Sequence, residues 1–259
     1  MGESKVEDMI EYKEKKATDL GIEFKWMALC VLTIFSYMLQ IANFGTGLDS
    51  SGLFAVNYFF DNKIVFGRDV YFSYGPLGFL CQTMNVGNNL IYAMLFWLAI
   101  SAFFAMLWYQ ILCGKKYFEK WKIVLAIVMC VVVECYASPE YFLYYIFFLA
   151  LFCSMFINRK NIYICDILIV FIMFIKFSAL IGIMSGWVMF ILLQFIYRES
   201  ARKIYLVHAV GSICASLLFF IIFYAKSVGI LIDYIRGGLE VSEGYGSGMS
   251  IHTSYDAYI

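Results

Sequence analysis

The chain has 259 residues, of which 63% are hydrophobic, 20% aromatic and only 15% charged. A soluble domain carries about 45–50% apolar and about 25% charged residues, so this composition excludes a water-soluble globule. It also excludes a disordered chain, and the balance of 19 basic against 19 acidic residues leaves no excess positive charge for a nucleic-acid partner. The sequence therefore predicts an all-α polytopic membrane protein.

Residues 1–25 precede the first apolar run and mix acidic residues with lysines at helical spacing. This pattern predicts a solvated, amphipathic cytoplasmic segment near the membrane surface. A regulatory or partner-binding role for the segment is the alternative.

Apolar runs long enough to cross a bilayer recur along residues 26–225. A spanning helix needs about 20 residues, and such runs cover 26–44, 90–112, 123–137, 141–157, 162–197 and 204–224. The run 162–197 is too long for one crossing, because a helix of that length would measure about 54 Å. We therefore expect two short spans with a hinge near Lys176, Phe177 and Ser178, which makes about seven transmembrane helices.

The distribution of positive charge predicts the orientation of these spans. With the N-terminus in the cytoplasm, 14 of the 19 Lys and Arg residues fall on inner segments, where positive residues accumulate in membrane proteins. The other five lie outside: Lys63, Arg68, Lys176, Lys226 and Arg236. We expect a multi-pass protein of the cell membrane, with a membrane module over 26–225 and an outward C-terminal segment over 226–259.

The first outward loop, residues 45–89, holds much of the polar sequence. Asp49 follows the first span at the water–lipid boundary, and Asp49 or Ser50 can cap a short juxtamembrane helix that reaches Phe60. Residues 74–77 (Tyr-Gly-Pro-Leu) predict a fixed turn, because proline sets φ and glycine permits unusual angles. Loops on a rigid scaffold often carry function, so we expect the site here.

These elements resemble the GT-C superfamily of integral-membrane glycosyltransferases, nearest to the bacterial branch related to protein mannosyltransferases and aminoarabinose transferases. In that superfamily the corresponding segment begins with a catalytic Asp and closes on a Pro-Leu motif after an aromatic residue and a glycine. Here Asp49 matches the acid, and residues 67–69 with 74–77 match the closing turn. Members usually carry a second acid beside the first and a Pro-Pro pair, whereas this chain has Ser50 and Gly75-Pro76. Full-length members usually continue with more spans, so we expect an N-terminal seven-span module or a fragment.

The resemblance implies transfer of a sugar from a polyprenyl-phosphate-linked donor to a hydroxyl of a glycan, lipid or protein acceptor at the outer face. Asp49 is then the general base that takes the hydroxyl proton. Asp69 is either a second acid of the site or a turn residue, and Tyr74 is a candidate substrate contact. The leaving phosphate needs cations, for which the candidates are Arg68, Lys176 and Arg236.

Two charged residues lie in or near apolar runs. Lys176 would cost about 2.5–3.5 kcal/mol there unless it is paired or its amine reaches the interface. We expect either that interfacial position or a phosphate or carboxylate partner. Glu134, near the outer end of the third span, can pair with Lys176, position an acceptor or reach water beside Pro139.

The chain shows no cluster of metal ligands at ligand spacing. Its eight cysteines form no CxxC pair, and most lie in apolar runs, where a thiol acts as a small hydrophobe. His208 reads as a packing histidine, and Asp166 as a residue that reaches water at the inner boundary. We therefore predict no protein metal site, although some GT-C relatives use a divalent cation at the acidic loop.

The glycine-rich tail does not fit a dinucleotide-binding pattern, and we expect residues 243–250 to form a flexible outer loop. Two other classes of function stay open: a transporter or flippase of a lipid-linked intermediate, and a non-catalytic assembly subunit. Transporters usually show inverted repeats, and the sequence shows no repeat.

Overall fold

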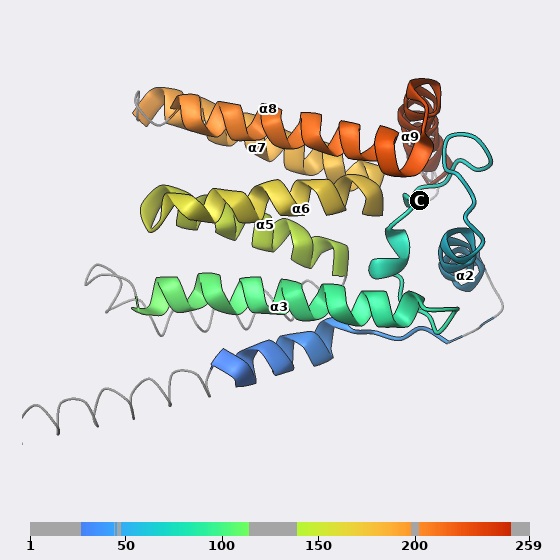
Figure 1. The fold of residues 1–259 in the computed structure, drawn as a ribbon, viewed down its shortest axis with the longest axis horizontal. Coiled ribbons are helices and arrows are strands. Elements are labelled where there is room, and N and C mark those ends of the chain that lie inside the picture. The colour runs from blue at the N-terminus through green and yellow to red at the C-terminus, as the bar shows by residue number, and fades with distance from the viewer. Residues whose placement is uncertain (1–26, 44, 46–47, 114–138, 198–201, 250–259) are drawn as a thin grey trace, which may run out of the picture.

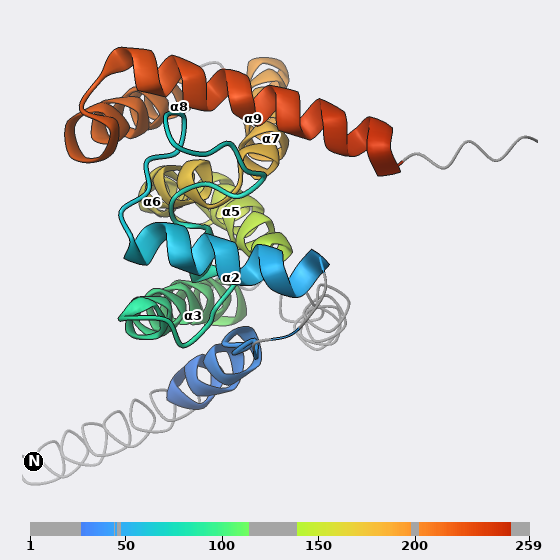
Figure 2. The same cartoon turned by 90° about the vertical axis from the view of Figure 1, so that its right-hand side faces the viewer.

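A computed structural model describes residues 27–43, 45, 48–113, 139–197 and 202–249, and in this part the protein is all-helical. Figure 1 shows a bundle of helices that run side by side, and those within residues 139–219 alternate in direction. Two further helices and the loop 62–88 lie across one end of this bundle (Figures 1 and 2), which we call the loop end.

The bundle comprises the helix Met27–Met38 and five longer or more central helices: α3 (Asn89–Cys113), α5 (Pro139–Phe156), α6 (Ile162–Ile175), α7 (Phe177–Tyr197) and α8 (Arg202–Phe219). Short helical turns are η1 (Gly78–Leu80), η3 (Arg159–Asn161) and the π-helical η4 (Phe220–Ala225). The helices across the loop end are α2 (Leu48–Asp61) and α9 (Val228–Met249). The expected span 123–137 lies outside the described residues.

α6 is the central helix of the bundle. It packs against α5, α7 and α8, and its buried residues point in several directions around the helix axis. A helix that is apolar all round has to be surrounded by other apolar groups, which explains the nearly unbroken apolar sequence of α6.

The chain breaks at Lys176, as the length of the apolar run predicts. Lys176 has an extended backbone (φ −154°, ψ 123°) between the end of α6 and the start of α7. From this point α7 runs back alongside the bundle (Figure 1). The hinge predicted near Lys176 is confirmed.

Three helices of the described part are long and apolar enough to cross a membrane: Asn89–Ile111, Pro139–Phe156 and Lys203–Ile222. Two apolar helices, Met27–Met38 and Ser178–Leu193, are shorter. The first predicted run is longer than its helix, because the chain leaves the helix after Met38 and the Ala42 N–H donates to the Thr83 carbonyl at 2.8 Å. These helices are compatible with a membrane protein.

α9 differs from the flexible loop expected for the tail. Its residues 243–249 are helical, so that expectation is wrong for them. α9 is anchored through buried Leu231 and Tyr234. At Gly237 a Cβ atom would lie 2.0 Å from Cδ1 of Tyr71, so this glycine allows close packing of helix and loop.

Candidate functional site

The turn 74–77 is fixed against the end of α6. The Gly75 N–H donates to the Ile175 carbonyl at 2.9 Å, and the Leu77 N–H donates to the Phe174 carbonyl at 2.8 Å. A Cβ atom on Gly75 would lie 2.4 Å from the Phe174 carbonyl oxygen, so only glycine allows this approach. The fixed turn predicted from the sequence is therefore confirmed, and it places Tyr74 opposite Lys176 in an antiparallel bridge.

Four polar side chains meet where this turn contacts α5 and α6. We call them the loop-end cluster: Tyr74, Gln82, Glu140 and Lys176. The Tyr74 hydroxyl donates to Glu140 Oε1 at 2.6 Å, and Gln82 Nε2 donates to the same oxygen at 3.0 Å and to the Tyr74 hydroxyl at 2.8 Å. Lys176 Nζ lies 3.8 Å from Glu140 Oε1 and 4.7 Å from the centroid of the Tyr74 ring.

Glu140 is the buried anion of this cluster. Only 7% of the residue is exposed, and it lies in the first turn of α5, where the helix dipole favours a negative charge. Burial, together with the nearby Glu140 charge, raises the pKa of Tyr74 well above its usual range, so Tyr74 stays a neutral hydrogen-bond donor.

Lys176 has the carboxylate partner that was one of its two predicted environments. Its side chain is 30% exposed, so Lys176 pairs with Glu140 and remains partly accessible from outside the cluster. A cation over the Tyr74 ring face adds a further attraction. Lys176 is therefore held at the loop end with part of its surface accessible.

An aromatic groove begins next to the loop-end cluster. It is a cavity of about 470 Å³ between α5 and α7, lined by Tyr141, Tyr144, Tyr145, Phe148 and Gly182. Its first residue, Tyr141, directly follows Glu140, and Gly182 lies less than two helical turns beyond Lys176. A Cβ atom at Gly182 would meet its nearest neighbour, Tyr144 Cε1, at 3.5 Å, an ordinary contact distance, so only a side chain larger than a methyl group would fill the groove from this position.

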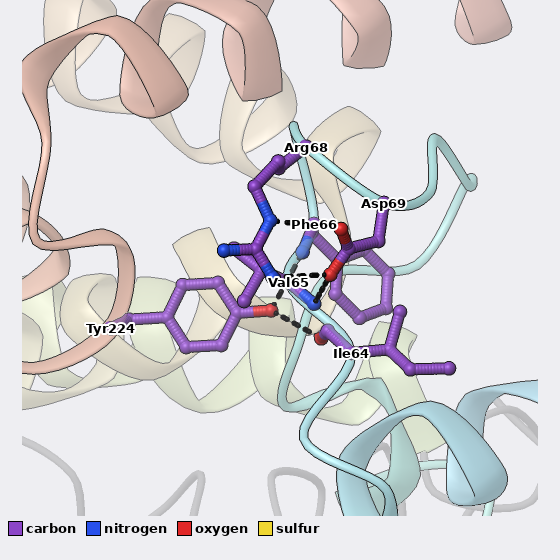
Figure 3. Close-up of polar contacts among 6 residues, drawn as sticks. All are labelled: Ile64, Val65, Phe66, Arg68, Asp69 and Tyr224. Atoms are coloured by element: carbon purple, nitrogen blue, oxygen red, sulfur yellow. Dashed lines mark hydrogen bonds and ion pairs between the residues drawn. The ribbon is translucent and has the colours of Figure 1, made fainter.

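Arg68 and Asp69 pair with each other in a separate turn of the loop (Figure 3). Arg68 Nε and Nη2 each donate to an Asp69 carboxylate oxygen at 2.8 Å, and the Val65 N–H donates to Asp69 at 3.0 Å. These contacts hold the pKa of Asp69 at about 2 and raise the pKa of Arg68. Figure 3 also shows the Tyr224 hydroxyl, which accepts from the Phe66 N–H at 2.8 Å and donates to the Ile64 carbonyl at 3.0 Å.

The other predicted site residues have different placements. Asp49 lies in the first turn of α2, which crosses the loop end, and its side chain is outside the described part of the structure. Arg236 is exposed on α9 and pairs with Glu240 one turn further, with Nε 3.1 Å from Oε1. Glu134 lies outside the described residues. The structure thus unites Tyr74 with Lys176, and it places Arg68 with Asp69 and Arg236 with Glu240.

A second ionisable pair, Asp166 and His208, links α6 and α8. His208 Nδ1 lies 2.7 Å from Asp166 Oδ2, and the Tyr163 and His208 rings are in an edge-to-face contact. The Asp166 side chain is partly exposed, as expected for a residue that reaches water, but its Oδ1 atom is buried and has no hydrogen-bond partner among the described residues. His208 is a packing histidine with a defined acidic partner.

Glu140 and Gln82 are members of the cluster that the sequence did not reveal. Glu140 follows Pro139 at the start of a helix, a pattern that is also typical of an ordinary turn. One sequence signal was available: the helix that follows Pro139 starts at the same side of the membrane as the helix before Lys176 ends. Glu140 and Lys176 are therefore expected at the same level of the bundle. That signal depends on knowing that α5 and α6 are neighbours.

Among the described residues, no group of three or more His, Cys, Asp or Glu side chains is arranged to hold a metal ion. Comparison of the chain with protein-family models, curated proteins and solved structures gives no match. The class that the fold defines is an all-helical protein with membrane-compatible helices, and its most developed polar site is the loop-end cluster beside the aromatic groove.

Proposed function

We propose that the protein is an integral-membrane glycosyltransferase. It moves a sugar from a polyprenyl-phosphate-linked donor to an acceptor hydroxyl at the outer face of the membrane, with Asp49 as the general base. The proposal rests on the likeness of residues 49–77 to GT-C enzymes and on the geometry of the loop end.

The observation that carries the proposal is the junction of the turn 74–77 with Lys176 beside an aromatic groove. A lipid-linked sugar phosphate needs an apolar channel for its chain and a cation at the point where the chain ends in phosphate. The groove between α5 and α7 is lined mainly by aromatic side chains and begins next to Glu140. Lys176 supplies an ammonium group at that position, held by Glu140 and Tyr74.

Each group has a proposed role in the reaction. The isoprenoid chain lies in the groove, and the donor phosphate contacts Lys176, whose charge stabilises the leaving group as the glycosidic bond breaks. Asp49 accepts the proton of the acceptor hydroxyl as the new bond to the sugar forms. Glu140 is a positioning residue that fixes the direction of Lys176 and Tyr74. Arg68, Asp69 and Arg236 lie at the same end, where they contact the donor head group or the acceptor.

We further propose seven membrane spans, with the N-terminus in the cytoplasm and the loop end outside. The described helices from α5 to α8 alternate in direction, and the ends assigned to the cytoplasm carry Arg159, Lys160 and Lys203. The positive-inside tendency supports this orientation.

The observations do not favour a transporter. Transporter sites are typically built from helices that are interrupted near the midplane and then continue across the membrane. The break at Lys176 instead ends one helix of the bundle and starts a neighbour that runs back from the loop end (Figure 1).

The test is a sugar-transfer assay with protein in nanodiscs, polyprenyl-phosphate-linked sugars as donors and a panel of glycan, lipid and peptide hydroxyl acceptors. We expect Asp49→Asn to lower the transfer rate by about 10²–10⁴-fold, since it removes the base. Lys176→Met should lower it by at least about tenfold, because a charge-assisted contact to phosphate is lost.

The matched control is Asp233→Asn, which removes an exposed carboxylate from α9 at the same end of the molecule and should leave transfer unchanged. Transfer by Asp49→Asn at the wild-type rate would overturn the proposed base. Movement of the intact donor between leaflets without sugar transfer would instead identify a flippase.

A further inference from the structure

A second cavity at the loop end is not lined by Tyr74, Glu140 or Lys176, although Pro76 of the turn 74–77 forms part of its wall. It has a volume of about 540 Å³ and is bounded by the end of α2, the following loop, the start of α3 and the segment that joins η4 to α9. Small-molecule sites usually have volumes of about 300–1,000 Å³. Two lysines, Lys63 and Lys226, line this cavity, which we call the lysine cavity.

Both lysines have a left-handed backbone. Lys63 has φ 56° and Lys226 has φ 54°, and they are the only non-glycine residues with positive φ in the described part of the chain. Lys63 ends α2 in a tight cap, in which its N–H donates to the Phe60 carbonyl at 3.1 Å and the next N–H, of Ile64, donates to Phe59 at 2.9 Å. Glycine is the usual residue at such a position, because a Cβ atom is disfavoured there. Two lysines at positions that favour glycine, both lining one cavity, indicate that the lysine side chains have a role in that cavity.

The two ammonium groups are not cancelled by carboxylates within the described residues. Neither Lys63 nor Lys226 forms an ion pair there. Asp61 also lines the cavity, but its carboxylate packs against Gly87, where a Cβ atom would lie 2.1 Å from Oδ1. Gly87 lies two residues before the start of α3, so the positive end of that helix shares in balancing the Asp61 charge. The cavity therefore keeps an excess of positive charge.

The remaining walls suit a ligand with a flat or ring-shaped body. Phe60 and Tyr92 both line the cavity, and their ring centroids are 6.2 Å apart in an edge-to-face contact. Asn88 adds amide groups beside the first turn of α3, where free helical N–H groups favour an anion. Tyr224 also lines the cavity, and its two hydrogen bonds to the loop hold its ring in place.

We propose that the lysine cavity binds a phosphate-bearing ligand of small-molecule size, with Lys63 and Lys226 contacting its phosphate group. The ligand is either a soluble organic phosphate or the head group of an anionic lipid. This site goes beyond the proposed function, because Tyr74, Glu140 and Lys176 do not line the cavity.

The test separates the charge of the lysines from their backbone strain. The full chain is placed in phosphatidylcholine nanodiscs, and binding of radiolabelled inorganic phosphate and glucose 1-phosphate is measured by equilibrium dialysis. A second set of nanodiscs contains phosphatidylglycerol, and the lipids that co-purify with each variant are quantified. We expect Lys63→Gly and Lys226→Gly each to weaken binding about tenfold.

The same glycine variants should be more stable without ligand, with the melting temperature raised by about 2–4 °C for each. Lys63→Met keeps the Cβ atom and should weaken binding without this gain. The matched control, Lys203→Met, removes an exposed lysine from the opposite end of the bundle and should leave binding unchanged.

Lysine-dependent binding of a soluble phosphate assigns a soluble ligand, and lysine-dependent retention of phosphatidylglycerol alone assigns a lipid head group. The proposal is overturned if neither probe distinguishes Lys63→Gly and Lys226→Gly from wild type. Lys176→Met should bind phosphate in this cavity as wild type does. The phosphate-binding result for this cavity therefore does not depend on whether the sugar-transfer proposal is correct.

Discussion

Two carboxylates of the bundle have opposite surroundings. Glu140 at the loop end accepts hydrogen bonds from Tyr74 and Gln82 and lies near the Lys176 ammonium group. Asp166 pairs with His208, and its second oxygen is buried without a hydrogen bond to any described residue. Glu140 joins three separate segments of the chain, whereas Asp166 joins two neighbouring helices.

The difference shows what each carboxylate contributes. A buried acid with several donors fixes the groups around it, since each donor loses its acceptor if the acid is removed. A partly exposed acid with one satisfied oxygen and one buried, unsatisfied oxygen stabilises much less, because the unsatisfied atom carries a desolvation cost. Glu140 is therefore expected to organise the loop end, and Asp166 to make a small net contribution.

The largest effect is expected for Glu140→Ala. It leaves the Tyr74 hydroxyl, the Gln82 amide and Lys176 without their shared acceptor, and it should lower the free energy of unfolding by about 3 kcal/mol. Glu140→Gln keeps a hydrogen-bond acceptor and should lower the free energy of unfolding clearly less than Glu140→Ala does. Reversible unfolding in mixed micelles measures both, and equal small losses would show that the cluster does not hold the loop end.

Gly75→Ala tests whether the turn must approach α6 closely. The new methyl group would lie 2.4 Å from the Phe174 carbonyl oxygen, so the turn must shift, at a cost of about 1–3 kcal/mol. Gly211→Ala in α8 is the control, because a Cβ atom there would meet no described atom within 4 Å beyond the neighbouring backbone of its own helix, and alanine favours a helix by about 1 kcal/mol. If Gly75→Ala is stabilised like the control, the docking of the turn is wrong.

Asp166→Ala should cost about 1 kcal/mol or less. It removes one hydrogen bond to His208, and it also removes the buried oxygen that has no partner. The measurement is the same unfolding experiment. If Asp166→Ala lowers the free energy of unfolding as much as Glu140→Ala does, the proposed difference between the two acids is wrong.

Asp69 provides a solvent-exposed reference. Its folded pKa is lowered from 3.8 to about 2, first by the Arg68 hydrogen bonds and then by the Val65 N–H. A lowered folded pKa means that the interaction stabilises fully above about pH 4 and is lost as the pH falls through about 2. The carboxyl ¹³C shift of Asp69 should titrate near pH 2 and move towards the ordinary range in Arg68→Met. A midpoint near 4 in the wild-type chain would contradict the pairing.

Much of the helical layout follows from the sequence, because long apolar runs and charged interruptions set helix positions directly. The break at Lys176 follows from the length of the run 162–197, and the turn at 74–77 follows from its proline and its glycine. The pairing partners Glu140 and His208 could not be predicted from the sequence. Tyr74 and Glu140 are 66 residues apart, and Asp166 and His208 are 42 residues apart, so each pairing depends on which helices are neighbours. The helical tail was missed because its glycines are typical of loops, although one of them permits close packing on Tyr71.

The most direct test of the central claim is photolabelling with a polyprenyl-phosphate sugar that carries a benzophenone in its isoprenoid chain. We expect labelled peptides from α5 that contain Tyr141–Phe148, and we expect Gly182→Leu, which fills the aromatic groove, to reduce labelling about tenfold or more. Gly182→Ala adds a methyl group at ordinary contact distance and should label as wild type does. Labelling that is confined to other helices, or that is unchanged in Gly182→Leu, would contradict a lipid-linked substrate in this groove.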